Sequence, residues 1–169
     1  NMMFEPVLIT DLSRLLNKEA PATAIPRKEA PAKPGPIQVI DATALIVDDN
    51  SVNLIVGGEI LRQFGLEVEE VESGSLALRA CEHTAFDIIF MDHMMPEMDG
   101  LETTRRIRKL GGPYATLPII ALTANAVAEA RHDFEDAGMD DFLSKPIESR
   151  KLEAILAKWL PESKKVSAS

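Results

Sequence analysis

Residues 43–64 read TALIVDDNSVNLIVGGEILRQF, and this stretch decides the expected fold. Its first five residues are apolar or β-branched, which predicts a short buried strand. Two aspartates follow, and then apolar residues such as Val52, Ile55 and Ile60 recur at near-helical spacing over residues 51–64. The stretch is therefore expected to form a strand and a helix with two carboxylates at their junction.

The same pattern of strand followed by helix recurs along the chain. The predicted strands are 43–47, 67–72, 87–91, 117–122 and 140–144. The predicted helices are 51–64, 74–83, 99–110, 126–137 and 149–159. Strict alternation predicts an α/β fold in which helices cover both faces of a parallel sheet through right-handed crossovers. The runs ALIV, IIFM and PIIAL are almost continuously apolar, as expected for central strands, whereas EVEEVE alternates like a peripheral strand.

The flanking segments differ in composition from this alternating region. Residues 18–36 mix prolines, alanines and charges without periodicity, which predicts a Pro/Ala-rich linker over residues 18–41. The alternative is an irregular part of the main domain. The main domain is expected to span residues 42–160, followed by a polar tail at 161–169.

The overall composition argues against several classes of protein. The net charge of −9 would repel nucleic acid phosphates, so we expect no direct nucleic acid partner. The apolar runs are far shorter than the ~18 residues of a membrane span, so we expect no membrane contact. The chain has a single cysteine, Cys81, expected to be a small core residue, and its start lacks the features of a secretory signal. A cytoplasmic setting fits these features best.

Polar residues follow the central strands at the points where the strands end. They are Asp48, Asp49, Asp92, Thr123 and Lys145. Because the carboxyl ends of parallel strands meet at one edge of the sheet, we expect these side chains to converge there. Neighbouring carboxylates repel one another unless a cation lies among them, and a dense cluster of hard oxygens suits Mg²⁺. The sequence therefore predicts a Mg²⁺ site whose metal-free form is destabilised.

The chain resembles the receiver domain of two-component response regulators over about residues 42–160. The resemblance rests on VDDNSVNL, MDHMMPEMDG, LTANA and LSKP, which occur in the family's order and at its spacing. The DDNxxN and TANA patterns are most similar to receivers of hybrid sensor histidine kinases. The resemblance implies a flavodoxin-like, doubly wound sheet of five parallel strands in the order 2-1-3-4-5, with five helices.

The resemblance also implies a role for each strand-end residue. Asp92 is expected to accept a phosphoryl group from a phosphohistidine. Asp48, Asp49, Asp92 and the backbone carbonyl of Met94 are expected to bind Mg²⁺, with Asp48 acting directly or through water. Lys145 is expected to pair first with the acceptor carboxylate and then with a phosphoryl oxygen.

Further positions are implied to take part in switching and in phosphoryl lifetime. Thr123 matches the family's switch hydroxyl, and Phe142 matches its switch aromatic, although a plain core aromatic is the alternative. The bond between Lys145 and Pro146 is expected to be cis. Met94 and Asn125 flank the approach of hydrolytic water, and neither is an acid or a base, so we expect slow autodephosphorylation.

The expected partners are a histidine kinase dimerisation domain, a histidine phosphotransfer protein, or both. Docking is expected near the first predicted helix and the pocket formed by the strand-end aspartates. Gly57 and Gly58 lie inside that helix, where each glycine costs roughly 1 kcal/mol relative to alanine. Two interpretations are open: the helix is simply weak, or the glycines let a helical partner approach closely.

The first 17 residues also resemble part of a receiver. FEPVLITDLSRLL aligns with SKPIESRKLEAIL through Pro6 and Pro146, which suggests the last loop and helix of a preceding receiver. Glu5 stands where that fragment would carry its lysine, so such a receiver would be degenerate. The alternative is an unrelated amphipathic helix with a proline at its start.

Other functions fit these residues less well than phosphoryl acceptance does. A receiver that only binds proteins would need a broken site, and none of the five strand-end positions is broken. An aspartate-nucleophile phosphohydrolase would need an acid two residues after its nucleophile, where this chain has Met94. Kinase activity would belong to another part of a longer protein, because the first strand is followed by no glycine-rich nucleotide-binding loop.

Overall fold

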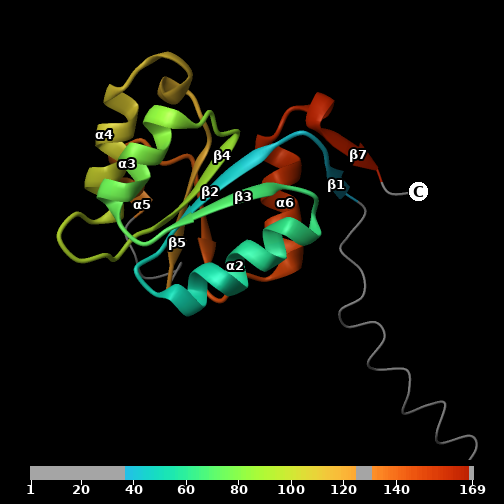
Figure 1. Cartoon of the computed structure of the whole chain (residues 1–169), viewed down its shortest axis with the longest axis horizontal. Coiled ribbons are helices and arrows are strands. Elements are labelled where there is room, and N and C mark those ends of the chain that lie inside the picture. The colour runs from blue at the N-terminus through green and yellow to red at the C-terminus, as the bar shows by residue number, and fades with distance from the viewer. Residues whose placement is uncertain (1–36, 125–130, 168–169) are drawn as a thin grey trace, which may run out of the picture. The chain divides into compact units, whose positions relative to one another are not determined.

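Five parallel strands form the centre of the fold (Figure 1). The computed structural model describes residues 37–124 and 131–167. The strands of the sheet are β2 Thr43–Val47, β3 Glu67–Val71, β4 Ile88–Asp92, β5 Ile119–Thr123 and β6 Asp141–Ser144. They pair in parallel in the order β3-β2-β4-β5-β6, which is the predicted order 2-1-3-4-5 when β2 is counted first. The predicted doubly wound sheet is confirmed.

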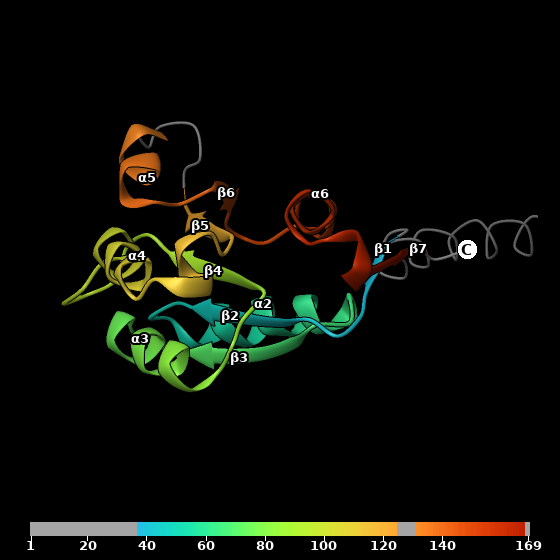
Figure 2. The same cartoon turned by 90° about the horizontal axis from the view of Figure 1, so that it is seen from above.

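Helices cover both faces of this sheet (Figure 2). The described helices are α2 Ser51–Gln63, α3 Gly74–His83, α4 Gly100–Lys109, α5 Arg131–Ala137 and α6 Ser149–Trp159. Apolar residues of α2 and α6 share one core with the sheet, and those of α3, α4 and α5 share the other. The predicted helix 126–137 is described from Arg131 onward, because residues 125–130 lie outside the described part. None of the described helices is long and apolar enough to span a bilayer.

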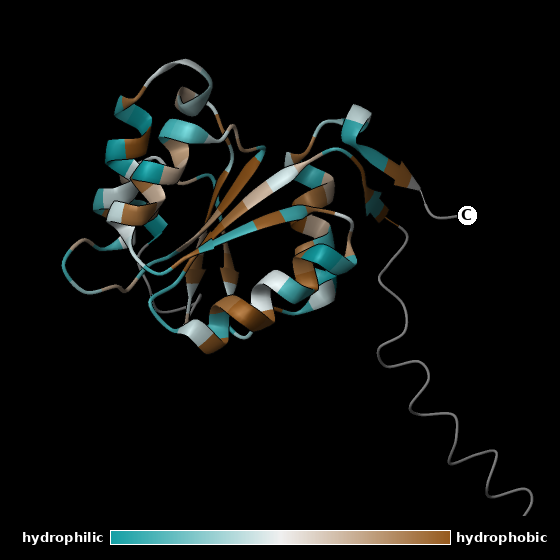
Figure 3. Cartoon of the chain, in the orientation of Figure 1, coloured by the Kyte–Doolittle hydropathy of each residue, from teal (hydrophilic) through white to brown (hydrophobic). Residues whose placement is uncertain are grey.

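The central strands are apolar along their whole length because each face of the sheet is covered. In β2, Ala44 and Ile46 pack into the core beneath α2 and α6, whereas Leu45 and Val47 pack beneath α3 and α4. β4 and β5 are buried at every position. Figure 3 shows the contrast with the largely hydrophilic edge strand β3.

A two-stranded ribbon lies outside the expected limits of the domain. β1 Ile37–Val39 pairs antiparallel with β7 Lys165–Ser167, and a 3-10 turn at Glu162–Lys164 precedes β7. The sequence predicts a linker at residues 37–41 and a polar tail at 161–169, whereas the structure has paired strands at Ile37–Val39 and Lys165–Ser167. Residues 1–36, including the proposed receiver fragment and most of the linker, lie outside the described part.

Contacts with the main domain hold this ribbon in place. Val39 is buried in the core, and its N–H donates to the carbonyl oxygen of Phe64 at 2.7 Å. Lys164 forms an ion pair with Asp87 at 3.2 Å and donates to the carbonyl oxygen of Asp41. The short strands therefore gain their stability from packing and ion pairs, which local sequence patterns do not reveal.

Arg108 organises the end of the sheet at which β5 begins. Its guanidinium donates to the carbonyl oxygens of Tyr114, Leu117 and Gly138 at 2.6–3.0 Å. It also pairs with Asp140 at 2.8 Å, and Asp140 in turn accepts the N–H of Ile119 at 2.9 Å. One cation thus satisfies a carboxylate and several carbonyl groups where the loops meet.

Candidate functional site

The strand ends bring the predicted polar residues together at one edge of the sheet. Asp48 follows β2, Asp92 ends β4, Thr123 ends β5 and Lys145 follows β6. Asp48, Asp49 and Asp92 each place a carboxylate oxygen within 4.8 Å of the other two. Asp48 and Asp92 are only 1% and 2% exposed, whereas Asp49 is exposed. We call these three aspartates and Lys145 the acid pocket.

Asp92 is held between a cation and other carboxylates. Its Oδ1 accepts a hydrogen bond from Lys145 Nζ at 3.0 Å and from the Met94 N–H at 3.3 Å. Burial, aided by the charge of Asp48, raises the pKa of Asp92 from 3.8 to about 6, although Lys145 opposes the shift. The side chain is thus an ionised carboxylate at neutral pH that is poorly compensated for its burial.

Lys145 is shared between two carboxylates. Besides Asp92, its Nζ lies 3.3 Å from Asp48 Oδ2. Burial lowers the pKa of Lys145, but the hydrogen bonds and charges of Asp92 and Asp48 outweigh it and hold this pKa above its ordinary value. The backbone N–H of Lys145 donates to the carbonyl oxygen of Thr123 at 2.8 Å. The peptide bond between Lys145 and Pro146 is cis.

The loop after β4 turns sharply beside Asp92. Gly100 is buried, and a Cβ at this position would lie 2.2 Å from the carbonyl oxygen of Asp92, so only glycine fits. The Gly100 N–H donates to the carbonyl oxygen of His93 at 3.1 Å, which closes the loop. The Met94 side chain is 68% exposed at the rim. An open pocket beside it is lined by His93, Met95, Pro96 and Asp99 as well as Asp49 and Met94.

The start of α2 is also built around the acid pocket. Asn50 caps the helix, since its Oδ1 accepts the N–H groups of Val52 and Asn53 at 2.9 and 3.4 Å. Its backbone N–H donates to Asp48 Oδ1 at 2.9 Å. Asn53 Nδ2 lies 3.3 and 3.2 Å from the two carboxylate oxygens of Asp48. Asn53 therefore contacts the acid pocket through its side-chain amide.

Comparison with known proteins gives this arrangement a family. Residues 44–157 match the family model of the response regulator receiver domain. The chain belongs to the response regulator receiver family. It is 43% identical over 117 residues to the sensor protein GacS of Pseudomonas syringae pv. syringae, covering 68% of this chain and 13% of that protein. The chain thus spans a small part of this curated relative.

Solved structures support the same assignment. The receiver domain of sensor histidine kinase PA1611 from Pseudomonas aeruginosa PAO1, with a magnesium ion in its active site cleft, is 41% identical with a TM-score of 0.64. The match covers 70% of this chain and 96% of that one. The Saccharomyces cerevisiae receiver domain of Ssk1, crystallised with the histidine phosphotransfer protein Ypd1, is 25% identical, with a TM-score of 0.64 and coverage of 72% and 90%.

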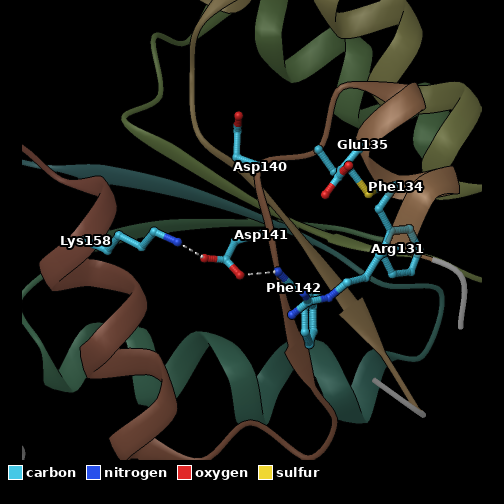
Figure 4. Close-up of a pocket in the computed structure, with 8 residues that line it drawn as sticks. Arg131, Phe134, Glu135, Asp140, Asp141, Phe142 and Lys158 are labelled. Carbon is cyan, nitrogen blue, oxygen red and sulfur yellow. Dashed lines mark hydrogen bonds and ion pairs between the residues drawn. The ribbon is translucent and has the colours of Figure 1, made fainter. Parts of the chain in front are cut away.

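The two predicted switch residues occupy different surroundings in this receiver domain. Thr123 is buried at the end of β5, beside the acid pocket. Phe142 is half-buried on β6 with the Arg131 guanidinium 4.8 Å from its ring centre. Phe142 and Arg131 line a pocket of about 210 Å³, which is also lined by Asp141 and Lys158. Figure 4 shows these residues. Asn125 lies outside the described residues.

Gly57 of α2 faces the sheet core, and Gly58 faces a side chain of the edge strand β3. A Cβ on Gly57 would lie 2.5 Å from Ile46 Cδ1, and one on Gly58 would lie 2.2 Å from Glu70 Oε1. Both glycines are buried, and Gly57 also lines a pocket beside Asp48 and Lys145. The interpretation that they let a partner approach closely therefore stays a prediction. The glycines allow α2 to pack closely on its own sheet. The side chains that α2 exposes are Val52, Ile55 and Val56.

Sequence reasoning missed the contact made by Asn53. In the sequence, Asn53 is only the last residue of the DDNxxN pattern. Three residues after the cap of a helix, its side chain returns toward the strand end, which geometry alone would have indicated. The available signal was a polar residue in the first turn of the helix, four residues after the second aspartate of a carboxylate pair.

Proposed function

We propose that this receiver domain accepts a phosphoryl group on Asp92 from a phosphohistidine. The observation that carries the proposal is the buried Asp92 carboxylate, paired with Lys145 and crowded by Asp48 and Asp49 at the carboxyl edge of the sheet. Membership of the receiver family and similarity to GacS support it. The parent chain would be a hybrid sensor histidine kinase acting in the cytoplasm.

The reaction uses the strand end as a fixed nucleophile. One carboxylate oxygen of Asp92 attacks phosphorus while the bond from phosphorus to the donor imidazole nitrogen breaks, leaving an acyl phosphate. Lys145 lies 3.0 Å from Asp92 Oδ1 and can follow the new negative charge onto a phosphoryl oxygen. The hydroxyl of Thr123 and the ring of Phe142 would then rearrange as the switch pair.

The acid pocket suits Mg²⁺ through its donor set. Asp48, Asp49 and Asp92 offer hard carboxylate oxygens within 4.8 Å of one another, and the Met94 carbonyl would complete the set from the adjoining loop. When bound, Mg²⁺ neutralises charge on the transferring phosphoryl oxygens. The PA1611 receiver domain with magnesium in its cleft supports the assignment.

The acyl phosphate is expected to be long-lived. Water approaching Asp92 would pass the exposed Met94 side chain, which carries no acid or base to activate it. A long lifetime suits transfer onward to a second protein. The same feature argues against a phosphohydrolase.

An intact-mass assay with phosphoramidate tests the proposal. We expect one phosphoryl adduct that requires Mg²⁺, is absent in Asp92→Asn and persists after the donor is removed. Asp136→Asn is the matched control, since Asp136 is an exposed carboxylate on α5, and it should be labelled like the wild type. If wild type and control both stay unlabelled while Mg²⁺ binds, the chain is a binding module that does not accept phosphate.

The partner is proposed to dock on α2 beside the acid pocket. Val52 and Ile55 are 63% and 62% exposed, an unusual density of apolar surface for one helix. A pocket of about 150 Å³ lined by Val56, Pro146 and Ile147 adjoins Asp48 and Lys145. A helical histidine phosphotransfer domain would cover this surface while its histidine reaches Asp92. The Ypd1 complex with the Ssk1 receiver supports this kind of partner.

A charge placed on α2 separates docking from chemistry. Ile55→Glu should slow transfer from a phosphohistidine protein but leave labelling by phosphoramidate unchanged, because the small donor needs no docking surface. Leu76→Glu is the matched control, since Leu76 is exposed on α3 over the opposite face of the sheet. Equal transfer rates for the two variants would remove α2 from the docking surface.

A further inference from the structure

The Asn53 side chain is turned toward the acid pocket although asparagine is a poor helix former. It lies in the first turn of α2, where alanine would favour the helix more. Its amide nitrogen is 3.3 and 3.2 Å from the two oxygens of Asp48. The side chain is half-buried, so these hydrogen bonds are partly shielded from water.

Few hydrogen-bond donors stabilise the buried carboxylate of Asp48. It is 1% exposed, and its hydrogen bonds come from the Asn50 N–H, from Asn53 Nδ2 and from Lys145 Nζ. Lys145 is the cation among them, and it lies closer to Asp92, at 3.0 Å, than to Asp48, at 3.3 Å. When Lys145 moves toward Asp92, the hydrogen-bond donors that remain on Asp48 are the two neutral ones from Asn50 and Asn53.

We infer that Asn53 is a positioning residue, which orients Asp48 and keeps it hydrogen-bonded when Lys145 is drawn to the phosphoryl group on Asp92. The inference rests on the proposed function, because the departure of Lys145 belongs to that reaction. Without Asn53, the buried Asp48 carboxylate would retain Lys145, since a buried charge without donors is costly. Asn53 thereby frees the lysine for the reacting oxygens.

An amide suits this position better than other side chains. It supplies N–H groups without adding positive charge, so the acid pocket keeps the negative charge that attracts Mg²⁺. A lysine would neutralise the pocket, an aspartate would add to its repulsion, and a leucine would leave Asp48 short of donors.

The neighbouring Asn50 provides a matched comparison. Its side chain caps the helix and donates nothing to Asp48, whereas its backbone N–H, which survives substitution, does. Asn50→Ala therefore removes a cap and lowers helix stability. Asn53→Ala raises helix propensity but removes the side-chain donor. The two variants separate helix stability from positioning.

Calorimetric titration of Mg²⁺ tests the positioning role. Asn53→Ala should raise the Mg²⁺ dissociation constant about tenfold, the effect typical of residues that orient metal ligands. Asn50→Ala should lower the melting temperature in EDTA while its Mg²⁺ dissociation constant stays within about twofold of wild type. An Asn53→Ala constant within about twofold of wild type would overturn the inference.

The dependence on Asp48 is tested by combining substitutions. In an Asp48→Ala background, Asn53→Ala should change Mg²⁺ affinity no further, because the residue acts through that carboxylate. With saturating Mg²⁺, Asn53→Ala should still be labelled by phosphoramidate more slowly than wild type, since Lys145 remains held. A full additional loss of affinity in the double variant would contradict the inference.

The outcomes also distinguish this inference from the proposed function. If wild type is labelled on Asp92 and Asn53→Ala matches it in Mg²⁺ affinity and rate, only the positioning role fails. If wild type is never labelled, phosphoryl acceptance fails, and with it the role assigned to Asn53 during the reaction.

Discussion

Two charged clusters lie at opposite ends of β5 and differ in their balance of positive and negative charge. At the start of the strand, Arg108 pairs with one carboxylate and satisfies several carbonyl oxygens. At its end, Lys145 is shared by Asp48 and Asp92, with Asp49 close by. The first cluster has as much positive as negative charge, whereas the second has three carboxylates for one ammonium.

The difference follows from what each end must do. A balanced, fully hydrogen-bonded cluster holds loops together and gains nothing from a ligand. An unbalanced cluster costs stability until a cation or a phosphoryl group changes its charge. The same strand thus joins a region built for stability to a region built to respond, as expected when functional sites depart from the rules of stable packing.

Breaking the balanced cluster should have the largest effect on stability. Arg108→Ala would leave the Asp140 carboxylate and the carbonyls of Tyr114 and Leu117 without their donor. We expect the free energy of unfolding in EDTA to fall by about 3 kcal/mol, measured by urea denaturation. Arg106→Ala removes an exposed arginine of the same helix and should change little. Equal losses of unfolding free energy in both variants would show that the Arg108 cluster contributes no more stability than an exposed ion pair.

Removing the cation from the unbalanced cluster should cost less stability and should raise the affinity for Mg²⁺. Lys145→Met should lower the free energy of unfolding in EDTA by about 2 kcal/mol, because Asp48 and Asp92 lose a shared partner. It should also tighten Mg²⁺ binding, since the competing positive charge is gone. Lys151→Met, at an exposed lysine on α6, is the control. Weaker Mg²⁺ binding in Lys145→Met would contradict the charge argument.

Removing a carboxylate from the same cluster should raise stability in a pH-dependent way. Because the folded-state pKa of Asp92 is raised from 3.8 to about 6, its protonation contributes stability that is fully present below pH 3.8 and is lost as the pH rises through 6. Asp92→Asn should therefore exceed wild type by about 1 kcal/mol at pH 7 in EDTA, a gain limited by the lost Lys145 contact.

Urea denaturation in EDTA across this pH range measures the effect. The difference between Asp92→Asn and wild type should grow from pH 4 to pH 7, whereas Asp136→Asn should show no such trend. A difference that is constant with pH would mean that burial of the Asp92 charge does not limit stability.

Much of the fold was predictable because strands and helices carry their own periodicity. The helices that are described at both ends begin and end within one residue of their predicted limits. For example, Ser51–Gln63 was predicted as 51–64. The acid pocket was predictable for a related reason, since parallel strands place Asp48, Asp92 and Lys145 at one edge. Neither inference required knowledge of side-chain packing.

The remainder depended on packing that no local pattern encodes. A glycine within a helix does not indicate which neighbour it admits, and Gly57 proved to face Ile46 of its own sheet. β1 and β7 are three residues each and meet from distant parts of the sequence, so neither strand could be predicted alone. In the sequence, Arg108 looks like an ordinary helix residue. Its hydrogen bonds to the carbonyl oxygens of Tyr114 and Gly138 depend on how distant loops pack.

The ribbon of β1 and β7 brings the two ends of the described domain together. Ile37 faces Ser167 across the ribbon, so the chain enters and leaves side by side. A short peptide can therefore join these residues into a ring, and the ring can be reopened at the exposed Gly112 and Pro113 with the sheet kept whole. The new termini of such a circular permutant would lie beside α4, so fused reporter domains would be attached there. The former ends in β1 and β7 would be covalently joined.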